Sequence, residues 1–319
     1  MPFILEAPAS ETHAEQSRAE WTPGTDNTTP APVPQITVAK GAPESQLPVG
    51  SRSRWRGLAG HSVLAVVALF CVFPVYWLFA TSLRRPEDAL SQNLIPWPLS
   101  LENYTYVLEA IPIVAMLVNT FLMASVMTFF QLLIAVLAAY GFAIWDFPGK
   151  RLAMFLFIGS WLVPFQVTMI PNYVLIANLG LLNTIAGVVI PNLASAFGVL
   201  MLLQHMRAFP RELIDAAKVD GRNSFLTLWQ VVLPNMKPAL AALASMMFIS
   251  AWNDSLWPML VLRQSDALIQ VGIRGFLSAE GNDWGAVMAA AGLACLPVLA
   301  IYIFLQRYVV NAFIRSRIK

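Results

Sequence analysis

The sequence predicts an all-α membrane protein with six transmembrane helices. Hydrophobic residues make up 57% of the 319 positions, charged residues make up only 12%, and the mean hydropathy is +0.63. A soluble domain usually carries about 25% charged residues. The apolar residues also form blocks of about 20 or more, the length that crosses a bilayer. These observations argue against a soluble enzyme.

Residues 1–50 differ in composition from the rest of the chain. They are rich in Pro, Ser, Thr, Ala and Glu and show no apolar period. Such a segment cannot bury enough surface to fold by itself. We therefore expect a disordered tail over residues 1–50 and a membrane domain over residues 51–319.

Six apolar blocks predict the spans of the membrane domain. Prolines inside or near the ends of these blocks predict kinks, and Pro164 and Pro171 enclose a stretch of the third block where we expect irregular backbone. The predicted spans are residues 60–82, 113–142, 152–171, 186–205, 239–262 and 286–306.

The distribution of Lys and Arg predicts the orientation. Of the 20 Lys and Arg residues, fourteen fall on the side that carries both termini and four on the other, with Arg18 and Lys40 in the tail. Positively charged loops stay in the cytoplasm. We expect both termini, including the tail, to be cytoplasmic.

Other site chemistries have little support in the sequence. A net charge of +2 gives no bulk attraction for nucleic acid. Cys71 and Cys295 lie inside apolar blocks and are expected to be free thiols. The three histidines show no metal-ligand spacing, so we predict no metal site.

The connection between the fourth and fifth spans, residues 207–237, carries the most information. Pro210 suits the first turn of a helix, residues 211–219 are mostly helix formers, and Gly221 suits its end. Leu213, Ala216, Ala217 and Val219 predict a small-residue stripe on this helix, beside Glu212, Asp215 and Lys218. A second short helix is expected over residues 225–232, before Pro234. The helix is either a docking element for another protein or an amphipathic connector on the membrane surface.

The same connection resembles the EAA loop in the permease subunits of bacterial ABC importers. That pattern is Glu-Ala-Ala, three residues, Gly, nine residues, Ile, one residue, and Leu-Pro. This sequence has Asp215 in place of Glu and Val231 in place of Ile at unchanged spacing, and the matching positions are Ala216, Ala217, Gly221, Leu233 and Pro234.

The resemblance extends over about residues 60–319 and is strongest with the carbohydrate-type branch. Leu162–Val167, Asn178–Thr184 and Trp252–Pro258 are similar to that branch, in which two different permeases pair. The chain resembles the second, smaller permease of the maltose and glycerol-3-phosphate systems. The resemblance implies a type I importer permease fold in a bacterial inner membrane and a sugar, oligosaccharide or sugar phosphate as cargo.

The resemblance also implies a set of partners. They are a different permease, a dimer of ATP-binding subunits, an extracytoplasmic solute-binding protein and the lipid bilayer. The helix after Pro210 would be a coupling helix that enters a cleft of the ATPase, with Glu212 sharing the role of Asp215. The chain lacks the phosphate-binding pattern G-x-x-x-x-G-K-[ST]. It would therefore be non-catalytic and bind no cofactor itself, and ATP and Mg²⁺ would belong to the partner.

Polar groups inside the apolar blocks are candidates for a substrate pathway, because they are costly at membrane depth. Asn253 and Asp254 fall within the fifth block between Trp252 and Trp257, a combination that suits a sugar. They could instead bond to neighbouring helices or to backbone freed by Pro258. Gln166 could line the same path or join helices.

Two other classes of function are also compatible with six membrane spans, when the spans are considered without the loop. A secondary transporter or channel would be expected to contain inverted repeats or a relay of several charges inside the membrane. Asp254 is the only clear charge within a predicted span, which is too few for such a relay. An intramembrane enzyme predicts a nucleophile with a base, or a metal set, and neither occurs in the sequence. The loop at residues 207–237 favours the importer.

Overall fold

The structure is a computed structural model that describes residues 52–262, 268–278 and 281–315. The chain divides into two units between residues 59 and 60, and the second unit covers residues 60–319. The predicted tail at residues 1–50 lies outside the described residues. Every described element belongs to the second unit, apart from the first turns of α1.

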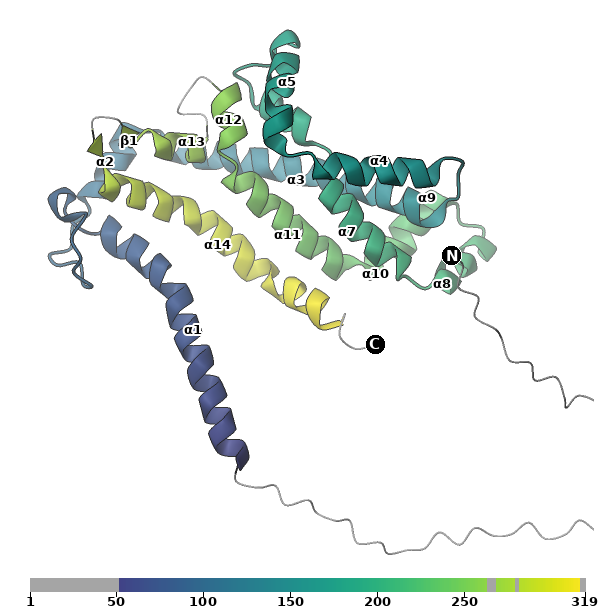
Figure 1. The fold of residues 1–319 in the computed structure, drawn as a ribbon, viewed down its shortest axis with the longest axis horizontal. Helices are drawn as coiled ribbons and strands as arrows, with labels where there is room; N and C mark the ends of the chain where they lie inside the picture. Colours follow the sequence, from purple (N-terminus) through teal and green to yellow (C-terminus); the bar gives the residue numbers. More distant parts are fainter. Residues whose placement is uncertain (1–51, 263–267, 279–280, 316–319) are drawn as a thin grey trace, which may run out of the picture. The chain divides into compact units, whose positions relative to one another are not determined.

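The described chain is almost entirely helical (Figure 1). The strands among the described residues form one short antiparallel hairpin, in which Leu277 pairs with Asn282, and connections such as residues 91–101 are irregular. The elements are α1 (Arg52–Ser82), η1 (Pro86–Asp88), α2 (Glu102–Ala110), α3 (Ile113–Ile144), α4 (Lys150–Leu162), α5 (Phe165–Asn178), α6 (Ile185–Val189), η2 (Ile190–Asn192), α7 (Ala196–Arg207), α8 (Arg211–Val219), α9 (Ser224–Thr227), η3 (Leu228–Val232, a π-helical turn), α10 (Leu233–Asn235), α11 (Lys237–Asn253), α12 (Leu256–Val261), α13 (Ile269–Arg274), β1 (Leu277–Ser278), β2 (Gly281–Asn282) and α14 (Trp284–Arg315).

Three helices in the described part of the chain are long and apolar enough to cross a membrane by themselves. They are Gly60–Ser82 of α1, the whole of α3, and Trp284–Phe304 of α14. Three further candidates are bent pairs: α4 with α5 at 95°, α6 and η2 with α7 at 43°, and Ser224–Asn235 with α11 at 83°. Counting each pair as one span gives up to six, so the all-α class is confirmed.

The third, fourth and fifth predicted spans are each interrupted in the structure, where the prolines of the third and fifth predicted only kinks or irregular backbone. The third breaks at Val163, which has an extended backbone ahead of Pro164. A residue before proline avoids the helical conformation. The expectation of irregular backbone between Pro164 and Pro171 is wrong, because residues 165–170 belong to α5 and the break lies just before Pro164. The fourth breaks before Ser195, whose hydroxyl accepts a hydrogen bond from the Gly198 backbone at 3.2 Å and so starts α7.

The fifth predicted span breaks at Asp254 and Ser255, between α11 and α12. Pro258 lies four residues after Asp254, so it has no N–H to donate to the Asp254 carbonyl, and its ring would clash with that carbonyl in a continuous helix. The expected kink is therefore a complete break, one turn before the proline.

The core lies along α3, which packs against both α7 and α11, while α11 packs against α14 (Figure 1). Ala135 and Ala139 of α3 are fully buried, and a Cβ on Gly198 of α7 would lie 2.2 Å from the Met247 Cε. Small residues thus let these helices approach closely. A second buried cluster joins the end of α3 to α7, α8 and η3, and it includes Tyr140, Leu202, Ile214 and Leu228.

Candidate functional site

The helix predicted after Pro210 is α8, and its predicted bounds are confirmed. Pro210 immediately precedes the first helical residue, Arg211. At the other end, the Arg222 N–H donates to the Ala217 carbonyl at 3.0 Å and the Gly221 N–H donates to the Lys218 carbonyl at 2.9 Å. These two bonds form a Schellman motif, which requires a left-handed residue. Gly221 supplies it with a φ of +76°.

The faces of α8 differ in part from the predicted stripe. Ile214 and Ala217 are each 4% exposed, and Ile214 belongs to the buried cluster with α3 and α7. Ala216 is exposed, and so are Leu213 and Val219, at 46% and 88%. The expectation that Ala217 lies with Ala216 on an outward surface is therefore wrong. Ala217 packs inside the loop, and the outward face consists of Leu213, Ala216 and Val219.

The chain after Gly221 turns back into a second helical segment that supports α8. The Asn223 side chain accepts a hydrogen bond from the Leu226 N–H at 2.8 Å and so caps α9. The Arg222 Nη1 donates to Gln230 Oε1 at 2.8 Å, which ties the turn to η3. The loop at residues 207–237 is thus a folded helix–turn–helix unit.

The second helical segment was predicted to end before Pro234. In the structure it continues through α10 to Asn235. A proline removes one hydrogen bond from a helix and clashes with the carbonyl four residues earlier. The π-helical turn at Leu228–Val232 widens the helix just before Pro234. Leu233 is half-buried and Pro234 is exposed.

The acidic residues of α8 are on its exposed surface. Asp215 Oδ1 lies 3.0 Å from Lys218 Nζ, with the side chains 66% and 58% exposed. An exposed pair of this kind contributes only about 0–1 kcal/mol, so Lys218 holds Asp215 weakly. Glu212 is exposed in the first turn, one turn before Asp215. Both carboxylates are accessible to a basic partner.

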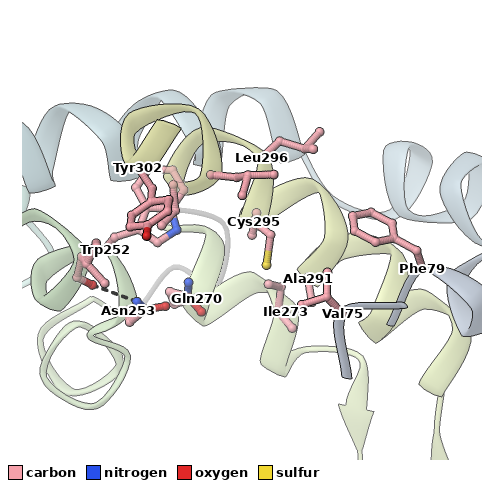
Figure 2. Close-up of a pocket in the computed structure, with 14 residues that line it drawn as sticks. Val75, Phe79, Trp252, Asn253, Gln270, Ile273, Ala291, Cys295, Leu296 and Tyr302 are labelled. Carbon is pink, nitrogen blue, oxygen red and sulfur yellow. Dashed lines mark hydrogen bonds between the residues drawn. The ribbon is translucent and has the colours of Figure 1, made fainter. Parts of the chain in front are cut away.

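Two of the five candidate pathway residues, Trp252 and Asn253, line a cavity of about 510 Å³ (Figure 2). The cavity lies among α1, α11, α13 and α14, and its polar side chains include Asn253, Gln270 and Tyr302. The Cys295 thiol also lines it. The sequence reasoning missed Gln270 and Tyr302. Tyr302 could have been found as a polar group inside the last apolar block. Gln270 could not be found in this way, because it lies in a connection between two blocks.

The other three candidate pathway residues do not line this cavity. Gln166 is exposed at the start of α5. Trp257 is fully buried and meets Phe165 edge-on at 5.8 Å. Asp254 occupies the break between α11 and α12, where the backbone N–H groups of Leu256 and Trp257 donate to its carboxylate. Asn253 donates to the Ile249 carbonyl at 2.8 Å. Asn253 and Asp254 thus bond to backbone next to the break, but neither bond reaches the Asp254 carbonyl, which Pro258 leaves without a helical donor.

Comparisons with known proteins agree with this fold. Residues 98–315 match the family described as binding-protein-dependent transport system inner membrane component. The arabinooligosaccharides transport system permease protein AraQ of Halalkalibacterium halodurans is 31% identical over 76% of this chain and 90% of its own length. The sn-glycerol-3-phosphate transport system permease protein UgpE of Yersinia pestis is 32% identical over 80% of this chain and 95% of its own length.

A solved structure shows the same arrangement of helices. It is the crystal structure of a bacterial ABC transporter involved in the import of the acidic polysaccharide alginate. The match has a TM-score of 0.70 and 24% sequence identity, and it covers 82% of this chain and 98% of the matched chain. At this identity the likeness establishes the fold alone.

Proposed function

The chain belongs to the family of binding-protein-dependent transport system inner membrane components, and from this premise we propose that it is a permease subunit of an ATP-driven carbohydrate importer. The observation that carries the proposal is the match to UgpE, which spans 80% of this chain and 95% of that protein. AraQ and UgpE are named for an arabinooligosaccharide and for glycerol-3-phosphate. Both are polyhydroxylated, so we assign sugars, oligosaccharides and sugar phosphates as the cargo class.

The coupling of transport to ATP is assigned to α8. A rigid helix with an exposed, shallow face transmits motion better than a flexible segment. The outward residues Leu213 and Ala216 let a partner backbone approach, and Glu212 and Asp215 offer carboxylates to basic groups. Because α8 and α3 share a buried cluster, a displacement of α8 is transmitted to a membrane-spanning helix.

The division of labour in the complex follows from the same proposal. A separate pair of ATPase subunits binds ATP and Mg²⁺ and hydrolyses ATP, so this chain is non-catalytic. A second, different permease completes the pathway, and an extracytoplasmic binding protein delivers the cargo. Both termini and α8 lie on the cytoplasmic side, in agreement with the excess of Lys and Arg on that side.

Loss of ATP-dependent uptake in a strain that lacks this chain tests the proposal. The strain retains the partner subunits, and uptake of labelled arabinooligosaccharide and of labelled glycerol-3-phosphate is measured with and without the restored gene. Restoration of uptake of at least one carbohydrate is expected. If the deletion changes the uptake of neither these cargoes nor a wider panel of sugars, the chain is not a carbohydrate permease.

The cavity in Figure 2 is proposed as part of the substrate pathway, and Cys295 reports on it. In a Cys71→Ser background, a hydrophilic thiol reagent should modify Cys295, and transported substrate should slow that modification. The same assay on Cys71, in a Cys295→Ser background, is the control, because Cys71 does not line the cavity. Equal modification of Cys295 with and without substrate, in a complex that transports, removes the cavity from the pathway.

A further inference from the structure

A second cavity lies beside α8, where the end of α3, the start of α4 and the end of α7 meet. Its volume is about 200 Å³. Three cationic side chains line it, and each comes from a different helix: Lys150 from α4, Arg207 from α7 and Arg211 from α8. The rest of the wall is apolar and includes Phe142 and Ile214.

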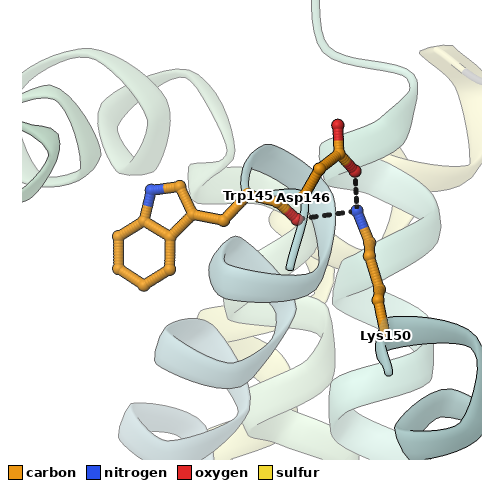
Figure 3. A network of polar contacts seen from close by, with 3 residues as sticks. All are labelled: Trp145, Asp146 and Lys150. Carbon is orange, nitrogen blue, oxygen red and sulfur yellow. Dashed lines mark hydrogen bonds and ion pairs between the residues drawn. The ribbon is translucent and has the colours of Figure 1, made fainter. Parts of the chain in front are cut away.

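The positive charge of this cavity is only partly neutralised. Figure 3 shows Lys150 Nζ donating to the Trp145 carbonyl and to Asp146 Oδ1, both at 2.8 Å. The Lys150 hydrogen bond lowers the pKa of Asp146, and the Arg211 charge lowers it further, so Asp146 stays ionised. Arg207 and Arg211 are exposed, and neither guanidinium group makes a hydrogen bond or ion pair with another described residue.

The cavity is large enough to hold one group of a ligand but too small to enclose a whole ligand. Pockets that enclose small molecules measure about 300–1,000 Å³. A volume of about 200 Å³ is smaller and suits a single anionic group. Guanidinium groups bind phosphate with paired hydrogen bonds, which makes arginine well suited to recognise phosphate.

The surroundings of the cavity place it at the edge of the apolar surface. The apolar run of α3 ends at Ile144, and Trp145 follows with 53% of its surface exposed. Trp is enriched where a membrane meets water. Immediately after Lys150, α4 exposes Leu152, Phe155 and Leu156 at 62%, 72% and 60%. An exposed apolar face thus continues directly from the cationic cavity.

We propose that this cavity binds the phosphate headgroup of an anionic phospholipid, whose acyl chains lie on the exposed face of α4. Basic pockets between membrane helices recognise lipid headgroups in this way. The bound phosphate joins α4, α7 and α8 across their ends and so fixes α8 relative to the spans. The binding requires only that the chain is embedded in a membrane, and it does not depend on ATPase docking.

Native mass spectrometry of the full complex tests this proposal. The complex is purified with its partner subunits and incubated with phosphatidylglycerol or with phosphatidylcholine of the same chain length. Phosphatidylglycerol should be retained in preference. The double variant Arg207→Gln/Arg211→Gln should lower its affinity about thirtyfold, because each surface cation contributes roughly fivefold. The charge-matched control Arg151→Gln/Lys237→Gln changes cations that do not line the cavity and should leave retention unchanged.

Each contrary outcome overturns the proposal in a recognisable way. If excess inorganic phosphate displaces the lipid, the cavity binds a free anion. If the double variant releases the ATPase subunit but still retains phosphatidylglycerol, the two arginines belong to the ATPase interface. If the control lowers retention as much as the double variant, the attraction is a general surface effect. Should the double variant fail to assemble, Arg207→Gln alone is expected to lower affinity about fivefold.

Discussion

Gly221→Val is expected to abolish uptake while the chain still inserts in the membrane. Gly221 has a φ of +76°, and a Cβ at this position would meet no atom within 4 Å. The effect is therefore backbone strain and not a clash. The left-handed conformation costs an ordinary residue about 1–2 kcal/mol, and a β-branched residue more. That cost lowers the ratio of Schellman-capped to uncapped α8 about 5- to 30-fold.

Two control variants separate strain from side-chain size. Gly221→Asn should keep much of the uptake, because Asn tolerates the left-handed region. Gly159→Val should also keep uptake, because Gly159 lies in α4 without a positive φ and a Cβ there would meet nothing within 4 Å. Uptake is measured at matched membrane levels of the chain. Full transport by Gly221→Val would show that the turn does not fix α8.

Ala216→Arg and Ala217→Arg are expected to fail for different reasons. Ala216 is exposed, so Arg at this position blocks a partner while the permease stays folded. Ala217 is 4% exposed, and its replacement buries a charge without a partner, which costs several kcal/mol. Ala216→Arg should therefore lose the ATPase subunit at an unchanged unfolding temperature. Ala217→Arg should lower that temperature as well.

The measurements are co-purification of the ATPase subunit and thermal unfolding in detergent. Ala216→Ser should retain the subunit, because it keeps the surface shallow. Ala110→Arg adds the same charge at an exposed position in α2 and should also retain it. An Ala216→Arg complex that keeps its ATPase would remove the outward face of α8 from the interface.

The sequence predicted those elements that depend on local signals. Pro210 and Gly221 bound α8 because each acts through its own backbone, and no distant contact is needed to fix either end. The break at Val163 follows in the same way from Pro164. The prediction of membrane spans used the length and hydropathy of each apolar block, and these are also properties of a short stretch of sequence.

The features that the sequence did not predict depend on tertiary contacts. A helical period shows that Ile214 and Ala217 share a face, but Leu213 and Val219 make the opposite face apolar too. Only the packing of Ile214 against α3 and α7 decides which face is buried. Four of the five candidate pathway residues lie within residues 252–257, yet the break at Asp254 separates Asn253, at the cavity, from Trp257, in the core.

The central claim is that the outward face of α8 docks on a separate ATPase, and site-specific cross-linking tests it most directly. In a Cys71→Ser/Cys295→Ser background, a thiol-reactive photo-cross-linker is attached at Ala216→Cys or at Val219→Cys. Both positions should cross-link to the ATPase subunit, while Ala110→Cys should not. If neither position of α8 cross-links in a complex that still hydrolyses ATP and transports, the docking assignment is wrong.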